Sequence, residues 1–304
     1  MKYYNDVREL IGHTPLVKLN HMNFKEGRNV FAKLELFNPG GSVKDRMGTA
    51  LVRDAEERGV LKPGYTILEA TAGNAGIGIA LAALGKGYRV IFAVPEKFSE
   101  EKQTIMKAYG AEIVHTPREK GMQGAIEKVE ELKQQVEHPV MLSQFENPAN
   151  PLAHYRTTGP EIYEDLDGKV DYLVAGAGSG GTLSGVAKFL KEKTSSLRVV
   201  MADPLGSTMG GGEPGCYAIE GIGNTFMPGT MDFSLVDQVY KIKDEEAIEE
   251  LRLLASEEGI LAGTSSGAAL SAARRAAVEA PEGSNLVVIL PDRGDRYFSK
   301  HIYG

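Results

Sequence analysis

Short apolar runs alternate with longer amphipathic stretches along most of this chain, and this order limits the folds available to it. Strands joined by helices of such length form βαβ units, which build mainly parallel sheets. We therefore predict an α/β protein with two lobes of mainly parallel sheet and a cleft between them. Predicted strands are 30–35, 66–70, 89–94, 112–116, 140–144, 171–175, 198–202, 238–242 and 285–290. Predicted helices include 43–58, 100–109, 121–135, 183–193, 244–258 and 266–279.

Two prolines interrupt this pattern in the segment NPANP at 147–151. A change of domain is expected there. We predict a smaller α/β domain at 40–147. Residues 1–39 and 148–304 are predicted to form a larger α/β domain.

Composition excludes several classes of protein. A net charge of −7 argues against a nucleic-acid or anionic-membrane surface. Cys216 is the only cysteine and the six histidines show no metal-binding spacing, so we expect neither a disulfide nor a metal. The N-terminus MKYYNDVREL has no apolar signal region, and no apolar run approaches membrane length. The expected location is the cytoplasm.

Lys44 stands at an unusual place for a lysine. In FNPGGSVKDR at 37–46, a Pro-Gly-Gly turn leads into a helix start, and Lys44 lies in its first turn. A helix N-terminus disfavours a cation. Either Asp45 offsets the charge and Lys44 points to water, or the site requires a neutral amine as a nucleophile or imine.

Three glycine-bearing turns precede predicted helices, and each could receive an anion on free backbone N–H groups. Any one of them could be only a tight turn. Three in one chain, together with Lys44, favour a ligand with several anionic groups. The turns are TAGNAG at 71–76, GAGSGGT at 176–182 and GTSSG at 263–267.

Two of these turns match motifs of other enzyme classes. Gly176, Gly178 and Gly181 fit the dinucleotide fingerprint GxGxxG, with Asp203 following, which would make the protein a nicotinamide dehydrogenase. That interpretation leaves Lys44 and the Thr71 turn unexplained. Residues 263–267 fit the hydrolase motif GxSxG, with Asp292 and His301 after it, but too little strand precedes the serine.

Taken together, the motifs resemble the β-family of pyridoxal-phosphate enzymes, the cysteine synthase and cystathionine β-synthase group. The resemblance covers nearly the whole chain and implies fold type II, the fold of the tryptophan synthase β-subunit. Its pieces are IGHTPLVKL at 11–19, NPGGSVKDR at 38–46, TAGNAGIG at 71–78, QFENPANP at 144–151, GAGSGGT at 176–182, EGIG at 220–223 and GTSSGAA at 263–269.

The resemblance also implies roles for individual residues. Lys44 would form an imine with pyridoxal 5′-phosphate and then move the substrate's α-proton. Asn74 would hydrogen-bond the cofactor's 3′-oxygen, and Ser265 would meet its pyridine nitrogen. The phosphate would be held by Gly178, Ser179, Gly180, Gly181 and Thr182. The substrate carboxylate would be surrounded by Thr71, Ala72, Gly73, Asn74 and Gln144. The smaller domain would therefore lie on the substrate side, and the larger would hold the cofactor phosphate.

Plainer interpretations of three of these residues remain open. Asn74 could be a left-handed turn residue, Ser265 a helix N-cap, and Gln144 an ordinary polar group at a strand end. The chain also departs from the family's SGNTG pattern at Ala72 and Ala75. Ala75 lacks a hydroxyl near the substrate, which puts turnover in doubt but not cofactor binding.

The implied reaction is β-replacement on O-acetylserine through an aminoacrylate. Homocysteine as the thiol gives cystathionine, and sulfide gives cysteine. ADPLGS at 202–207, EGIGNTFMP at 220–228 and TAGN favour the cystathionine-forming, short bacterial acetylserine-using branch over a cysteine synthase. A non-catalytic binder that retains the fold but has lost turnover is a hypothesis of a different class, and the nicotinamide dehydrogenase is the third. Similar proteins are homodimers, so a homodimer is expected.

Overall fold

The computed structural model describes residue 1 and residues 3–71, 73–96 and 99–304 of the chain. Ala72, which we predicted to contact the substrate, lies outside the described residues. The chain divides into two compact units. The smaller consists of Met1–Ile11 and Lys44–Ala149, and the larger of Gly12–Val43 and Asn150–Gly304.

The N-terminal segment differs from the predicted division. We expected residues 1–39 in the larger domain, whereas residues 1–11 belong to the smaller unit. The Arg8 guanidinium donates hydrogen bonds to the carbonyls of Ala82 and Leu84, at 3.2 and 3.0 Å, and so ties this segment to the smaller unit. The substrate and phosphate roles of the two domains stay predictions.

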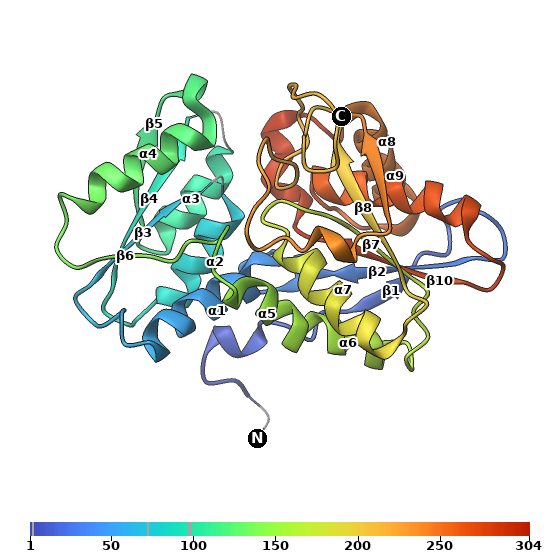
Figure 1. The fold of residues 1–304 in the computed structure, drawn as a ribbon, viewed down its shortest axis with the longest axis horizontal. Coiled ribbons are helices and arrows are strands. Elements are labelled where there is room, and N and C mark those ends of the chain that lie inside the picture. The colour runs from blue at the N-terminus through green and yellow to red at the C-terminus, as the bar shows by residue number, and fades with distance from the viewer. Residues whose placement is uncertain (2, 72, 97–98) are drawn as a thin grey trace. The chain divides into compact units, whose positions relative to one another are not determined.

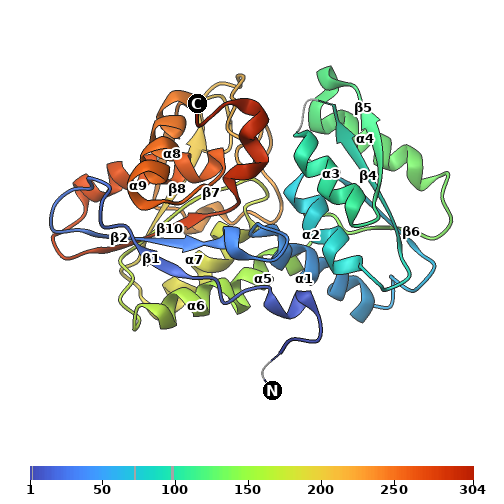
Figure 2. The same ribbon diagram turned by 180° about the vertical axis from the view of Figure 1, so that it is seen from behind.

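The smaller unit is a four-stranded parallel sheet with the order β5-β4-β3-β6. Helix α4 covers one face, and α1, α2 and α3 lie on the other (Figure 1, Figure 2). Both faces of the sheet are therefore buried, which explains the continuous apolar runs of its strands. Its elements are η1 (Val7–Leu10), α1 (Lys44–Glu57), β3 (Thr66–Ala70), α2 (Asn74–Ala83), β4 (Arg89–Pro95), α3 (Glu100–Ala108), β5 (Glu112–Thr116), η3 (Arg118–Lys120), α4 (Gly121–Lys133) and β6 (Pro139–Met141).

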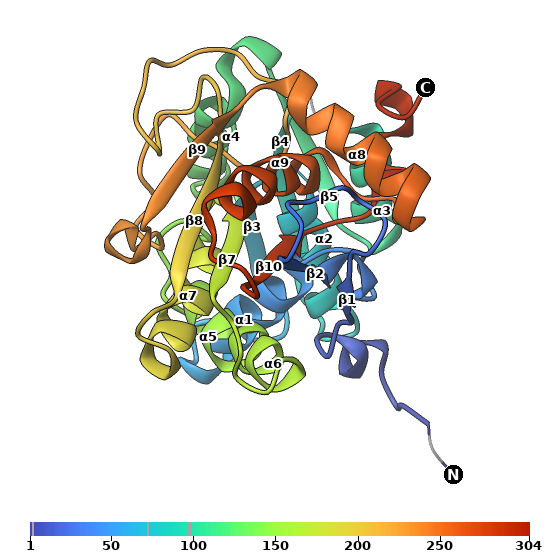
Figure 3. The ribbon, with the colours of Figure 1, turned by 90° about the vertical axis from the view of Figure 1, so that its right-hand side faces the viewer.

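The larger unit is a six-stranded sheet with the order β1-β2-β10-β7-β8-β9, parallel except for the β1–β2 pair. Helices α8 and α9 pack on one face, and α6 and α7 on the other (Figure 3). Its elements are β1 (Leu16–Lys18), β2 (Asn29–Leu34), η2 (Glu35–Phe37), α6 (Thr158–Asp165), β7 (Tyr172–Gly176), α7 (Gly181–Lys193), β8 (Arg198–Pro204), η4 (Phe233–Leu235), β9 (Gln238–Ile242), α8 (Asp244–Glu258), α9 (Thr264–Glu279), β10 (Asn285–Leu290) and η5 (Gly294–Lys300). Helix α5 (Ala149–Arg156) starts in the smaller unit and continues in the larger.

Strand order reverses once in each parallel region. In the smaller sheet the chain runs outward from β3 to β5, and β6 then returns to the other side of β3. In the larger sheet it runs outward from β7 to β9, and β10 returns beside β7. Ligands of open α/β sheets bind beyond the carboxyl ends of the strands at such switch points. The ends of β3, β6, β7 and β10 are therefore the places to search for a site.

The α/β prediction is confirmed, and most element bounds agree within two residues. One strand is shorter than predicted: 140–144 becomes β6, which ends at Met141. Gln144 lies in the turn after this strand, because the amides of Ser143 and Gln144 donate to the side chain of Glu69 rather than to a neighbouring strand. In the described part of the chain, no helix is both long and apolar enough to cross a membrane.

Candidate functional site

The loop after β3 is shaped by the side chain of Thr71. Its hydroxyl is fully buried and accepts hydrogen bonds from the amides of Gly73 (3.1 Å) and Gly76 (3.0 Å). Thr71 therefore acts as a cap for the first turn of α2. Because the Thr71 hydroxyl oxygen already accepts two hydrogen bonds inside the loop, this side chain fixes the shape of the loop. An anion at the loop would then be bound by the neighbouring backbone N–H groups.

Gly73 is required by the conformation of this loop. Its φ angle is +142°, and a Cβ atom there would lie 2.5 Å from Cδ of Lys102. Lys102 is itself only 3 % exposed, so its aliphatic stem forms the wall behind the loop. Asn74 follows as the first residue of α2, half-buried, where a helix N-terminus favours an anion.

The turn after β6 lies beside this loop, at the switch point. The Gln144 side chain is 5 % exposed, and its Nε2 donates to the carbonyl of Ala70 at 3.2 Å. The amides of Ser143 and Gln144 donate to the two carboxylate oxygens of Glu69, at 3.0 and 3.3 Å. Burial raises the pKa of the Glu69 carboxyl to about 7, although these hydrogen bonds favour its ionised form.

Lys44 lies in the first turn of α1, as the sequence predicted, and is the first residue of this helix; it is partly buried. The backbone of α1 touches that of α2. A Cβ atom on Gly78 would lie 2.3 Å from the carbonyl oxygen of Lys44, and one on Gly48 would lie 2.2 Å from the carbonyl carbon of Gly78. This glycine contact fixes the start of α1 against the helix that begins at Asn74.

In the larger unit, the turn from Gly176 to Thr182 connects the end of β7 to the start of α7. Gly180 has a φ angle of +80°, and a Cβ atom there would lie 2.5 Å from Cβ of Met231. Side chains hold the turn from outside: Asn224 Nδ2 donates to the Gly178 carbonyl (2.6 Å) and Thr230 Oγ1 donates to the Ser179 carbonyl (2.5 Å).

These contacts engage the carbonyls of Gly178 and Ser179 and none of the turn's amides. Within the described residues, no backbone or side-chain acceptor meets the amides of Gly181 and Thr182. Gly181 is buried, so its N–H has no ready access to water. Unsatisfied amides at the start of a helix form an anion site.

Thr182 and Ser265 complete the predicted residues of the larger unit. Thr182 Oγ1 lies 3.2 Å from Nε2 of His154, whose Nδ1 lies 2.9 Å from Thr158 Oγ1. Ser265, 3 % exposed, lies in the first turn of α9. The amide of Gly263, the N-cap of α9, donates to the Asp292 carbonyl just beyond β10 (3.0 Å). Ser265 and the Gly176–Thr182 turn therefore lie at the same switch point.

The structure thus gathers the predicted residues into two groups, one in each unit. Thr71, Gly73, Asn74 and Gln144 form one group with Lys44. The other group contains Gly178–Thr182 and Ser265. Several residues that hold these groups were missed from the sequence. Of these, Glu69 carried a signal, since it is a carboxylate inside the apolar run TILEA.

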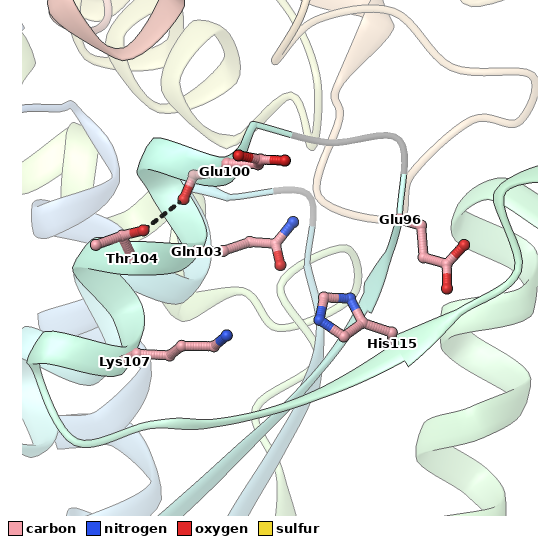
Figure 4. Close-up of a pocket in the computed structure, with 6 residues that line it drawn as sticks. All are labelled: Glu96, Glu100, Gln103, Thr104, Lys107 and His115. Carbon is pink, nitrogen blue, oxygen red and sulfur yellow. Dashed lines mark hydrogen bonds between the residues drawn. The ribbon is translucent and has the colours of Figure 1, made fainter. Parts of the chain in front are cut away.

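A polar hollow elsewhere on the smaller unit contains none of the predicted residues. Figure 4 shows it between α3 and β5, with Thr104 Oγ1 donating to the Glu100 carbonyl at 2.9 Å. It is lined by Glu96, Glu100, Gln103, Thr104, Lys107 and His115. Among the described residues, no group of three or more His, Cys, Asp and Glu side chains is arranged to bind a metal.

The sheets carry helices on both faces, and glycine turns lie at their switch points. These features define an α/β protein of the kind that binds phosphorylated small molecules. The model of the pyridoxal-phosphate dependent enzyme family matches residues 7–292. The chain belongs to this family, and its cofactor is pyridoxal phosphate. The resemblance inferred from the sequence is confirmed, and so is fold type II.

Individual relatives match over nearly their full length. The chain is 52 % identical over 303 residues to the O-acetylserine dependent cystathionine beta-synthase of Bacillus subtilis, covering 100 % of this chain and 99 % of that one. It is 46 % identical over 305 residues to a cysteine synthase of Staphylococcus aureus, covering 99 % and 98 %. The crystal structure of O-acetylserine dependent cystathionine beta-synthase from Helicobacter pylori aligns with a TM-score of 0.96 at 44 % identity, covering both chains completely.

The donor set fits this cofactor. Among the described residues, the amides of Gly181 and Thr182 meet no acceptor, and such a pair of N–H donors suits a phosphate dianion. The family membership also excludes the two competing motif interpretations. Gly176, Gly178 and Gly181 are therefore not a dinucleotide fingerprint, and phosphate binding by this turn stays a prediction. Ser265 lies in a helix preceded, among the described residues, only by an isolated bridge from Ala262 to Arg293, so the strand that a hydrolase serine needs is missing.

Proposed function

We propose that this enzyme catalyses β-replacement on O-acetylserine, with homocysteine as the thiol and cystathionine as the product. The observation that carries the proposal is the 52 % identity, over the full length, to the Bacillus subtilis protein that bears the corresponding name. The stretches at 202–207 and 220–228 support the same branch.

The smaller unit would supply the amine and the substrate site. Bound pyridoxal phosphate supplies an electron sink for bond breaking at the substrate's α-carbon. Lys44 would hold the cofactor covalently and afterwards carry the α-proton on Nζ. Lys44 is the first residue of α1, and a helix N-terminus disfavours a cation, which supports a role as an amine that binds the cofactor.

The substrate carboxylate would bind at the N-terminus of α2. The backbone of Gly73 and Asn74 and the amide of Gln144 are the donors that we assign to it. Thr71 contributes by holding this loop in shape through its two accepted hydrogen bonds. Asn74 would also meet the cofactor's 3′-oxygen.

The larger unit would hold the rest of the cofactor. Gly178, Ser179, Gly180, Gly181 and Thr182 would bind the phosphate through backbone N–H groups and the Thr182 hydroxyl. His154 would orient that hydroxyl. Ser265 would place a neutral hydroxyl against the pyridine nitrogen, which favours elimination over a long-lived carbanion because a hydroxyl does not keep the nitrogen firmly protonated.

The alternative is a cysteine synthase that uses sulfide. It is favoured by the 46 % identity to the Staphylococcus aureus cysteine synthase. A non-catalytic binder is the remaining candidate, because Ala75 lacks the hydroxyl found in the family's SGNTG pattern. The homodimer and the cytoplasmic location stay predictions.

The test is to supply O-acetylserine to the purified holoenzyme with homocysteine or with sulfide, and to measure kcat/KM for each thiol. We expect a higher kcat/KM with homocysteine and cystathionine as the product. A higher value with sulfide would make the protein a cysteine synthase. Binding of O-acetylserine without release of either product would identify the binder. Lys44→Ala serves as the control for uncatalysed reaction.

A further inference from the structure

A buried carboxylate lies directly behind the residue to which we assign substrate binding. Glu69 is 5 % exposed, and it belongs to the face of β3 that also carries Ile67. Its carboxylate accepts hydrogen bonds from the turn after β6. None of the roles proposed above uses it.

The turn that Glu69 contacts has an unusual backbone. Ser143 is not glycine, yet its φ angle is +55°, in the left-handed region. In this conformation successive amides point to one side and form a concave anion-binding nest. The amides of Ser143 and Gln144 both point at the Glu69 carboxylate, at 3.0 and 3.3 Å. The carboxylate therefore fills the nest as an internal anion.

The same turn carries the Gln144 side chain. Its Nε2 donates to the carbonyl of Ala70, the neighbour of Glu69 in β3. The backbone and the side chain of Gln144 are thus both anchored to the end of one strand. Any loosening of the Ser143–Gln144 amides would change where Gln144 points.

We propose that Glu69 is a positioning residue for substrate binding, which in its ionised form holds the Ser143–Gln144 turn and thereby orients Gln144. This inference rests on the proposed function, because it takes Gln144 as part of the substrate site. A protonated carboxyl has an O–H donor in place of one acceptor, so it cannot receive both amides equally well. Substrate affinity should therefore follow the ionisation of Glu69.

The chemical setting places this ionisation near neutral pH. Burial raises the pKa of Glu69 to about 7, and the amides of the turn oppose that rise. The elements packed on the same face of the sheet are α1, α2 and α3. The charged side chains that these helices bury are Asp45 and Arg46 of α1 and Lys102 of α3, and α2 carries none. A variant at position 69 separates the titration of Glu69 from any effect of these groups.

The test compares the wild-type holoenzyme, Glu69→Gln and Asp54→Asn, with O-acetylserine as substrate, between about pH 6 and about pH 8. Asp54 is the matched control because it contacts the same segment through Asn147 (3.0 Å) but is not buried. For the wild type and the control we expect KM to fall about tenfold as pH rises through 7, with kcat changed less than about twofold. In Glu69→Gln we expect KM to stay high at every pH.

Two outcomes would overturn the proposal. One is a Glu69→Gln enzyme whose KM equals that of the wild type. The other is a Glu69→Gln enzyme whose KM still changes near pH 7 as in the wild type, since one of the remaining charged groups would then cause that change. If Glu69 had only a structural role, Glu69→Gln would lower the stability of the protein but would keep the change of KM near pH 7.

A second measurement does not depend on activity or on the folding of a variant. Hydrogen exchange of the Ser143 and Gln144 amides in the wild-type protein, corrected for intrinsic rates, should slow as pH rises through 7. The Gly110 amide, which donates to the Lys107 carbonyl, is the internal reference. Protection independent of pH would refute the role of Glu69. A shift in protection without any turnover of O-acetylserine would show that ionised Glu69 holds the turn, and would refute the proposed function instead.

Discussion

Gly48 of α1 and Gly78 of α2 bring two helix backbones into direct contact. A Cβ atom on Gly48 would lie 2.2 Å from the carbonyl carbon of Gly78, and one on Gly78 would lie 2.3 Å from the carbonyl oxygen of Lys44. No side chain intervenes, so the position of Lys44 depends on the absence of a methyl group at Gly78. Several measurable consequences depend on this contact and on the two residue groups at the switch points.

Gly78→Ala should push α1 away from α2, because backbone atoms cannot rotate aside as a side chain does. Overpacking of this kind costs about 1–3 kcal/mol. We expect lower stability in urea and reduced cofactor loading, measured by absorbance of the lysine-bound cofactor. Gly215→Ala is the control, since a Cβ atom there has no contact closer than 3.4 Å. Unchanged loading in Gly78→Ala would show that the contact does not position Lys44.

Lys44→Ala should abolish the adduct that borohydride reduction forms between the protein and its cofactor, while the protein stays folded. Peptide mass mapping of the reduced wild-type enzyme identifies the modified lysine, and circular dichroism of the variant tests its folding. Lys102 is the most informative alternative attachment site, because it is a buried lysine that lies against Gly73 in the loop after β3. A reduced peptide that contains Lys102 and not Lys44 would contradict the assignment.

Gly180→Ala should weaken cofactor binding at least about tenfold, because the loss of one hydrogen bond to a charged group costs about 1.5–3 kcal/mol. The added Cβ would collide with Met231, and a φ angle of +80° strains any residue other than glycine. Titration of the apoprotein with pyridoxal phosphate measures the effect, again with Gly215→Ala as control. Wild-type affinity would place the phosphate elsewhere.

Ala75 tests whether the missing hydroxyl limits turnover. Its methyl group is 6 % exposed and packs in the apolar cluster with Met47 and Phe92, so a larger side chain carries a packing cost. The variants Ala75→Thr and Ala75→Val introduce side chains of similar volume, and only the threonine carries a hydroxyl. We expect the threonine variant to convert O-acetylserine faster than the valine variant by about one to two decades, the equivalent of one hydrogen bond to a charged group. Cofactor content should be normal in both. Equal rates in stopped-flow spectroscopy would mean that position 75 does not serve the chemistry.

Glu69 should also make stability depend on pH. Its pKa rises from 4.5, which the unfolded chain would retain, to about 7 in the folded protein. Between these values the folded state holds more protons, so the free energy of unfolding falls as pH rises. The shift corresponds to on the order of 3 kcal/mol. In Glu69→Gln this part of the fall in unfolding free energy should be absent, and urea unfolding at several pH values measures it. If the unfolding free energy of both proteins changed with pH in parallel, the raised pKa of Glu69 would be contradicted.

Much of the fold was predictable because its signals are local. Runs such as 66–70 and 112–116 carry strand periodicity within a few residues, and their bounds match β3 and β5. The strand predicted at 140–144 was too long, because nothing in those residues shows that Glu69 captures the amides of Ser143 and Gln144. That contact joins residues more than seventy positions apart.

The sequence by itself determined the α/β class, the glycine turns before the helices and the place of Lys44 at the start of α1. These features follow from periodicity, glycine conformation and helix polarity, which act over a few neighbouring residues. Only the tertiary structure decided that Glu69 contacts the backbone of Gln144 and that Gly48 and Gly78 join α1 to α2. It also decided that the amides of Gly181 and Thr182 meet no acceptor in the part of the chain that is described. Strand order and helix packing bring these groups together, and both depend on contacts between distant residues that no local pattern records.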